Sequence, residues 1–164
     1  MSQEFYVKMT GKKQSLFKGE SKKDKRGDWH EGLGLQMGSI VAVDANTGAA
    51  KSFRQHKPII ITKQRGASSP MILQAHWKNE TLDEVIIEIV SRAIDGNEEI
   101  VTERITLTGV TVSQVDRYTA NNAKATVQTD VDHLEDYGLR FTSILVEDVV
   151  SSTSTSDDWT KPNG

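Results

Sequence analysis

The amino-acid sequence predicts an all-β fold, a barrel-like pair of antiparallel β-sheets with one short α-helix over about residues 70–79. Apolar and polar residues alternate with period two along most of the chain, which is the pattern of half-buried strands. The turn sequence Asp95-Gly96-Asn97 lies between two alternating segments and predicts a hairpin. A single segment combines a helix start signal with a mostly apolar run, so the helix is an addition to a β scaffold.

The strand predictions rest on which positions carry apolar side chains. Alternation begins at Phe5 and recurs around residues 33–43 and 85–89. The apolar faces of these strands consist of Phe5, Val7, Met9, Leu33, Leu35, Met37, Val41, Val43, Val85, Ile87 and Ile89. The opposite face of the 33–43 run carries Gly34 and Gly38, and glycine inside a strand often marks a place where another backbone comes close.

The returning strand of the hairpin changes phase at Gly109. Its apolar residues are Val101, Ile105 and Leu107 before the glycine and Val110 and Val112 after it. A slip of one residue would turn the second set to the wrong face, so we expect a bulge or a sharp corner at Thr108-Gly109. A last strand follows around residues 137–146, and apolar residues on both of its faces indicate that it is covered on both sides.

The helix prediction comes from residues 59–79. A strand begins at Ile59, a polar turn follows, and Ser69 places an N-cap residue ahead of Pro70 at the first helical position. The helix is mostly apolar, so we expect it to pack against a sheet, with Trp77 docking it there. Truncation of a docked Trp77 to alanine is then expected to cost about 3–5 kcal/mol.

Length and composition predict one globular domain at residues 1–150, followed by a flexible tail at 151–164 that lacks periodicity. The 164 residues are 36% hydrophobic and 26% charged, and no run approaches the roughly 18 apolar residues of a membrane-spanning helix. The N-terminus lacks the apolar block of a secretory signal, so synthesis and folding are expected in the cytoplasm. A net charge of −3 gives no reason to expect nucleic acid as a partner.

Patterns of catalysis and metal binding are missing from the sequence. Cysteine is absent, which excludes disulfides, thiolate metal sites and thiol nucleophiles. The four histidines show no metal-ligand spacing, and no phosphate-binding Gly-Lys-Ser or Gly-Lys-Thr occurs. We therefore expect no enzyme, no cofactor and no metal site.

Charge is distributed unevenly along the chain. Residues 8–26 carry eight Lys or Arg against two acids, whereas residues 128–164 carry eight acids against one Arg and one Lys. Two solvated loops would explain this pattern, and self-association through opposite charges is the functional alternative. The charged residues considered for such association are Lys22, Lys23, Lys25, Asp130, Asp132 and Asp136.

Several motifs together resemble the Hcp family, the haemolysin-coregulated proteins that form the tube of the bacterial type VI secretion system. The resemblance covers about residues 3–150. Its elements are Phe17-Lys18-Gly19-Glu20-Ser21 after the first strand, Asp28-Trp29 ahead of a strand ending at Met37-Gly38, and PIIITK followed by Ser68-Ser69-Pro70 and Ala75. Two departures are Gly66, where family members often have an acidic residue, and Met37, where a tryptophan is usual.

The resemblance implies a structural role. Six protomers would close into a ring with a wide channel, and rings would stack into an inner tube that works with sheath and spike proteins. The tube would be assembled in the cytoplasm, released without a signal peptide, and would carry small effector proteins in its lumen. Gln36 corresponds to a channel-facing position that affects cargo in related proteins.

Two other classes of protein remain open from the residues alone. A phage-type tail tube subunit would show the same physical pattern, and only the Lys18-to-Ser21 and Ser69-Pro70 elements favour secretion over it. A β-sandwich binding module would also be all-β, but it would stay a monomer of 18.2 kDa.

Overall fold

The computed structural model describes residues 4–19, 21, 26–51, 53–92, 99–119 and 133–160. It confirms the predicted class, because strands dominate, they form two antiparallel sheets, and there is one short helix among the described residues. The strands are β1 (Glu4–Gly11), β2 (Ser15–Leu16), β3 (His30–Gly32), β4 (Gly34–Gln36), β5 (Ser39–Ile40), β6 (Gln55–His56), β7 (Ile59–Gln64), β8 (Thr81–Arg92), β9 (Glu99–Thr119), β10 (His133–Arg140), β11 (Ser143–Asp148) and β12 (Thr153–Asp158), and the helix is α1 (Ser69–Trp77).

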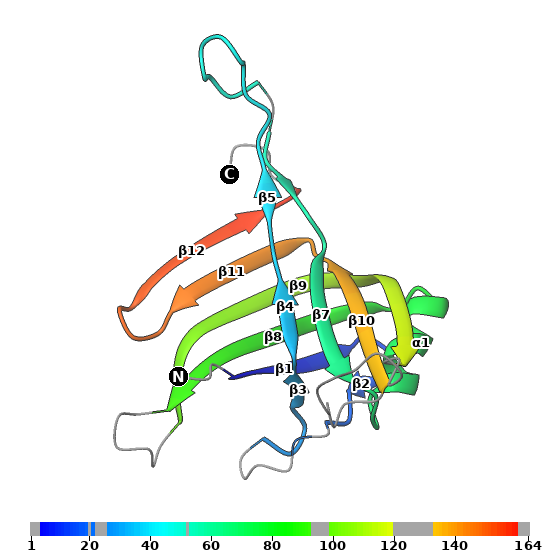
Figure 1. Ribbon diagram of the computed structural model, residues 1–164. Coiled ribbons are helices and arrows are strands. Elements are labelled where there is room, and N and C mark those ends of the chain that lie inside the picture. Colours follow the sequence, from blue (N-terminus) through cyan, green and yellow to red (C-terminus); the bar gives the residue numbers. More distant parts are fainter. Residues whose placement is uncertain are drawn as a thin grey trace, which may run out of the picture.

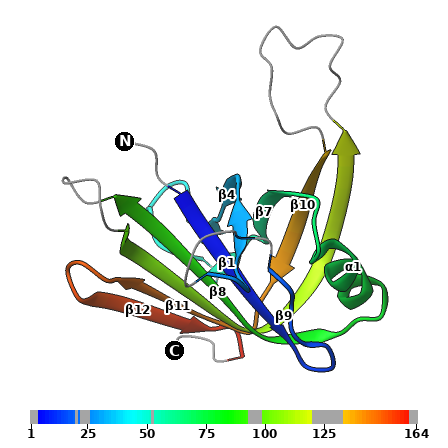
Figure 2. The same cartoon turned by 90° about the horizontal axis from the view of Figure 1, so that it is seen from below.

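The larger sheet is strongly curved and does not close into a barrel. Its strand order is β2-β1-β8-β9-β10-β7-β4, with β3 added to β1 and the β11–β12 hairpin added to β9. Residues 30–36 contact both sides of this sheet, because β3 pairs with β1 and β4 pairs with β7, each over three residues. Figures 1 and 2 show the long strand β9 passing through both halves of the molecule.

The predicted corner at Gly109 is confirmed. Gly109 has a φ of +61°, a left-handed conformation that glycine adopts without strain. Before this residue β9 pairs with β11, and after it β9 pairs with β10. The change of phase therefore marks the point where β9 leaves one half of the sheet for the other, while its apolar residues stay in one core.

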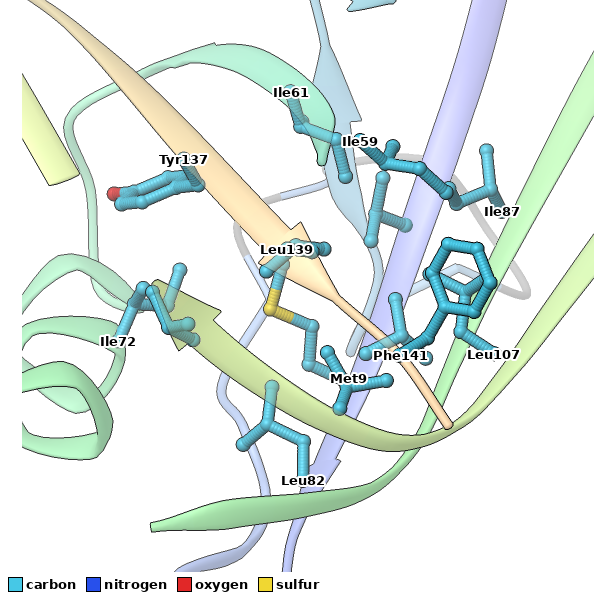
Figure 3. Close-up of a cluster of buried hydrophobic side chains, with 14 of the residues drawn as sticks. Met9, Ile59, Ile61, Ile72, Leu82, Ile87, Leu107, Tyr137, Leu139 and Phe141 are labelled. Carbon is cyan, nitrogen blue, oxygen red and sulfur yellow. The ribbon is translucent and has the colours of Figure 1, made fainter. Parts of the chain in front are cut away.

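The core lies in the hollow of the curved sheet. Figure 3 shows Met9, Ile61, Leu107 and Leu139 converging from four different strands, and all four are fully buried. Ile72 of α1 reaches the same cluster, so the helix covers one side of the hollow. Burial of this apolar surface is the main force that holds the curved sheet together.

Helix α1 begins one residue earlier and ends two residues earlier than predicted, and it is docked by different residues. Ser68, rather than Ser69, is the N-cap residue, and Pro70 lies in the first turn. Ile72 and Ala75 are buried, whereas Trp77 is 72% exposed, so the prediction that Trp77 docks the helix is wrong. With 3.6 residues per turn, Trp77 lies about 140° around the helix from Ile72 and faces away from the sheet.

The run at 33–43 does not form the single half-buried strand that its alternation predicts. β4 ends at Gln36, and the chain continues into an arm, residues 37–57, that carries the two-stranded sheet β5–β6 and projects from the body (Figure 1). Leu35 packs against the core, but the other apolar residues of the run are between 40% and 58% exposed. These exposed residues are Leu33 (54%), Met37 (46%), Val41 (40%) and Val43 (58%).

The region predicted as a flexible tail contains a strand. β12 pairs with β11 along its whole length, from Thr153 opposite Asp148 to Asp158 opposite Ser143. Its first four residues are exposed on both faces, which explains why the sequence shows no alternation of polar and apolar residues. Residues 161–164, the end of the predicted tail, lie outside the described residues.

Candidate assembly surfaces

The functional features of the described residues are surfaces rather than a cluster of reactive side chains. Within the described ranges, no group of three or more His, Asp or Glu side chains is placed to hold a metal ion. No helix of these ranges is long and apolar enough to cross a membrane. The surfaces with distinct chemistry are the arm with its root, the loop after β2, and the outer face of α1.

The root of the arm is tied to β12 by Arg54, His56 and Asp157, the arm-root cluster. Arg54 donates from Nε and Nη2 to the two carboxylate oxygens of Asp157, each at 2.7 Å. A second bond from Arg54 Nη2 reaches the carbonyl oxygen of Asp158, also at 2.7 Å. His56 Nε2 lies 2.6 Å from Asp157 Oδ2. This paired geometry, with two parallel bonds to one carboxylate, is among the strongest that a protein side chain can make.

Arg54 and His56 favour the ionised form of the Asp157 carboxylate. The hydrogen bond from Arg54, and after it the one with His56, hold the pKa of Asp157 well below its ordinary value of 3.8. The imidazole of His56 also lies between two aromatic rings, with centroid distances of 5.1 Å to Phe141 and 5.3 Å to Trp159. The arm is therefore attached to the body by both polar and aromatic contacts, although it projects into solvent.

A shallow groove lies beside this attachment. It has a volume of about 350 Å³ and an apolar lining that includes Met37, Ile144 and Val146. Together with the exposed apolar residues of the arm, it places several uncovered hydrophobic side chains in this part of the protein, as at interaction sites of other proteins.

The motif around Lys18 has a structural explanation. A side chain at Gly19 would clash with the backbone of Asp28 and Trp29, so only glycine lets the two segments lie this close. Ser21 then donates its backbone N–H to the carbonyl oxygen of Trp29 at 3.0 Å, and Lys18 is exposed. Glu20, the remaining residue of the motif, lies outside the described residues.

Arg26 holds the far end of this loop on the body. Its guanidinium lies 4.4 Å above the ring of Tyr6 and 4.9 Å from the ring of Trp29. It also forms ion pairs with Glu88 at 3.1 Å and with Glu99 at 3.4 Å. The basic residues Lys22, Lys23 and Lys25 between these two anchors lie outside the described residues.

The second motif, Ser69-Pro70, joins α1 to β10. Ser69 Oγ accepts the backbone N–H of Gly66 at 3.0 Å and donates to the buried carboxylate of Glu135 at 3.0 Å. Arg117 lies 3.0 Å from the other oxygen of Glu135 and pairs with it by charge. The backbone N–H of Gly66, one of the two departures from the family resemblance, therefore supports the turn through Ser69.

Gln36 is the exposed last residue of β4 and stands opposite Ile60 of β7. The glycine preceding it on the same face, Gly34, lies so close to Thr62 that an added Cβ would stand 3.3 Å from that side chain. The neighbour of Gly34 is thus a side chain, and the close backbone approach expected at this glycine is not observed. The role of Gln36 toward cargo stays a prediction.

Of the three acidic residues considered for self-association, the structure describes only Asp136. Asp130 and Asp132 lie outside the described residues. Asp136 accepts a hydrogen bond from Thr62 Oγ1 at 2.6 Å and a longer one from the Tyr118 hydroxyl at 3.4 Å. Asp136 therefore already has partners within its own protomer.

These features define a class, a β-rich subunit whose projecting arm and uncovered apolar surface suit it to assembly with other copies. Comparison with known proteins gives the family: the family described as "Type VI secretion system effector, Hcp" matches residues 6–147. The chain belongs to the Hcp family and is a structural tube subunit of a type VI secretion system.

Relatives agree with this assignment. The "Major exported protein" of Pseudomonas aeruginosa PAO1 is 29% identical over 96% of this chain and 95% of its own. A crystal structure of an Hcp protein superposes with a TM-score of 0.88 at 21% identity, over 98% of this chain and 99% of the other. Hcp1 of Escherichia coli EAEC 042 gives 0.81 at 24% identity, over 95% and 98%. Proteins of the Hcp family are secreted and form hexameric rings.

The arm-root cluster was missed by the sequence analysis. Arg54 and Asp157 are 103 residues apart and neither belongs to a local pattern, so no spacing could have paired them. The order of residues in β12 gives only one hint, because Asp157-Asp158 followed by Trp159 is a change from the preceding Ser and Thr run.

Proposed function

We propose that six copies of this tube subunit close into a ring and that these rings stack into the inner tube of the secretion machine. The observation that carries the proposal is the set of exposed apolar side chains on the arm and beside its root. Exposed hydrophobic surface of this kind marks interaction sites on soluble proteins. In a stack of rings the arm has another copy to contact, which removes this surface from water.

The mass in solution tests ring formation. Light scattering and native mass spectrometry are expected to give six times the 18.2 kDa of one chain, and negative-stain images are expected to show rings with a central channel. A mass of 18.2 kDa at all concentrations from micromolar to millimolar would contradict the proposal and favour a monomeric binding module.

The contribution of the arm can be tested separately. We expect Val43→Lys to weaken association of copies, because a charge would replace an exposed apolar side chain on the arm. Thr47→Lys is the matched control, since Thr47 is an exposed turn residue of the same arm. Equal assembly of the two variants would show that the apolar surface of the arm is not an interface.

The tube is proposed to assemble in the cytoplasm, to be expelled without a signal peptide by a contracting sheath, and to carry a spike at its tip. Secretion by the family and the name of the Pseudomonas relative support this route. The protein is expected in the culture medium of wild-type cells and absent from the medium of cells that lack the sheath. Equal export by both strains would exclude this route.

Small effector proteins are the proposed cargo of the lumen, with Gln36 as a contact. Gln36→Arg is expected to reduce co-purification of a cognate effector while rings persist. Gln55→Arg makes the same chemical change on the arm, where Gln55 is also exposed, and is expected to leave co-purification unchanged. Equal retention by Gln36→Arg and the wild type would remove Gln36 from the cargo site.

A further inference from the structure

The outer face of α1 forms a groove that the tertiary structure leaves open. The groove has a volume of about 450 Å³ and an apolar lining that includes Pro70, Leu73 and the exposed Trp77. Its rim carries three cations, Arg65, Lys78 and Arg117. We call this feature the α1 groove.

The charge of the α1 groove is only partly balanced within the protomer. Arg117 pairs with the buried Glu135. Lys78 forms no ion pair with the described residues, and the buried Nε of Arg65 has no hydrogen-bond partner among them. The α1 groove therefore favours an occupant that places an apolar side chain beside one or more carboxylates.

The turn between β11 and β12 has this combination of groups. Val149 and Val150 are exposed at 38% and 68%, and they directly follow Glu147 and Asp148. Neither acid forms an ion pair with the described residues. Two hydrogen bonds hold the turn: Ser151 donates its backbone N–H to Asp148 Oδ1 at 2.9 Å, and Val149 donates to the carbonyl oxygen of Thr102 at 3.0 Å. A tip with both acidic and apolar side chains is thus exposed to solvent.

The two features lie on opposite flanks of the protomer. Both Figure 1 and Figure 2 place the β11–β12 turn at the left edge of the molecule and α1 at the right edge. The turn therefore cannot enter the α1 groove of its own chain. A contact between one surface of a copy and a different surface of the next copy is heterologous, and such contacts produce a closed ring when the rotation between copies closes.

We propose that the β11–β12 turn of each protomer docks in the α1 groove of the next protomer in the ring. Val150 packs against Trp77 and Leu73, while Glu147 and Asp148 face Lys78 and Arg65. The inference rests on the proposed ring, for which it supplies a specific lateral contact. The contact also explains why Trp77 is exposed in the protomer. A tryptophan that becomes buried at an interface often contributes a large share of the binding energy.

Cross-linking tests the proximity of the two surfaces. The chain has no cysteine, so Trp77→Cys combined with Val150→Cys introduces the only two thiols. A short bismaleimide is expected to produce a ladder of linked chains that extends beyond dimers, because a heterologous contact links each copy to two others. Replacing Val150→Cys by Thr47→Cys, on the arm, is the matched control and is expected to give no such ladder.

Charge reversal tests the energetics of the same contact. Lys78→Glu and Glu147→Lys are each expected to raise the dissociation constant of the ring on the order of tenfold, and the double variant is expected to recover most of the loss. Circular dichroism melting of each variant separates ring loss from unfolding. Rings of wild-type stability in both single variants, together with no ladder, would overturn the inference while leaving the proposed ring intact. A monomeric wild type would reject both.

Discussion

Gly109 marks the corner at which β9 exchanges β11 for β10 as its partner strand. At Gly109 the change of phase in the sequence was sufficient to predict a corner, since each apolar residue of β9 has to reach the same core. The direction of the corner and the identity of its partner strands could not be predicted, because they depend on β10 and β11, which follow much later in the chain.

Gly109→Ala is expected to destabilise the protein by roughly 1–3 kcal/mol. An added Cβ would require a strained backbone at φ +61° and would stand 2.5 Å from Thr142 Oγ1. Gly48→Ala is a matched control, because Gly48 has a similar φ of +71° with no atom within 4 Å of the added Cβ. Urea unfolding of both variants separates backbone strain from the contact with Thr142. Equal losses would show that the contact has no effect.

The sequence of α1 does not show which face of the helix is buried, because the helix is mostly apolar. Every turn of α1 offers an apolar residue, so the sequence could predict a docked helix but could not predict that Trp77 points outward. Trp77, the largest apolar residue of the helix, was wrongly predicted to be buried. A large apolar side chain can pack in the core of a protein or lie exposed at a surface that binds a partner, and the sequence does not distinguish the two.

Ile72→Ala is expected to lower the free energy of unfolding by about 2–5 kcal/mol, since Ile72 is fully buried. Trp77→Ala is expected to change it by about 0.5 kcal/mol or less, as is usual for exposed positions. Thermal melting of the monomeric state at low protein concentration compares the two. A larger loss in Trp77→Ala than in Ile72→Ala would contradict the orientation of α1.

At the scale of elements, the central hairpin was predictable and the ends of the sheet were not. β8 and β9 pair as expected from their apolar faces, although the turn predicted at residues 95–97 lies outside the described residues. β12 has no such face, and the apolar face predicted for the arm is exposed instead of buried. Their positions depend on main-chain pairing with β11 and on the arm-root cluster, both of which join distant parts of the chain.

The arm-root cluster predicts a specific dependence of stability on pH. The pKa of Asp157 is lowered in the folded state, so its interactions stabilise the fold at pH values above the ordinary pKa of 3.8, and this contribution declines as the pH falls below that value. We expect Asp157→Asn to reduce the urea midpoint by a constant amount between pH 7 and about pH 5, with the difference shrinking toward pH 3. Asp83→Asn, on the exposed surface of β8, is the control. A difference that stays constant to pH 3 would exclude a role for the ionised carboxylate.

At the scale of the whole molecule, the family and the architecture followed from the order of short motifs. The structure explains one of them by close backbone approach at Gly19 and the other by the bond between Ser69 and Glu135. The assembly surfaces could not be predicted in this way. The α1 groove and the β11–β12 turn can be recognised as complementary surfaces only in the folded protein, where they lie on opposite flanks. Their residues share no local pattern in the sequence.

Ionic strength is expected to separate the contacts within a ring from those between rings. The charges proposed to act between rings are the basic residues from Lys12 to Arg26 and the acids from Asp130 to Asp136. Exposed ion pairs are worth only about 0–1 kcal/mol each and are screened by salt. Sixfold repetition makes their sum sufficient to influence stacking, whereas the lateral contact proposed above includes the apolar pair of Val150 and Trp77, which salt does not weaken. Sedimentation is therefore expected to show far fewer stacked rings at high salt than at low salt, with the rings themselves intact at both.

Reversal of charge in the basic segment should reproduce the effect of salt on stacking. Replacing Lys22, Lys23 and Lys25 together by glutamate is expected to give single rings even at low ionic strength. The variant Glu84→Lys, on the exposed surface of β8, changes charge outside both segments and outside the arm and serves as the control. Stacks that persist equally in the triple variant and at high salt would show that opposite charges do not hold the rings together, and the contact between rings would then have to depend on the apolar residues of the arm.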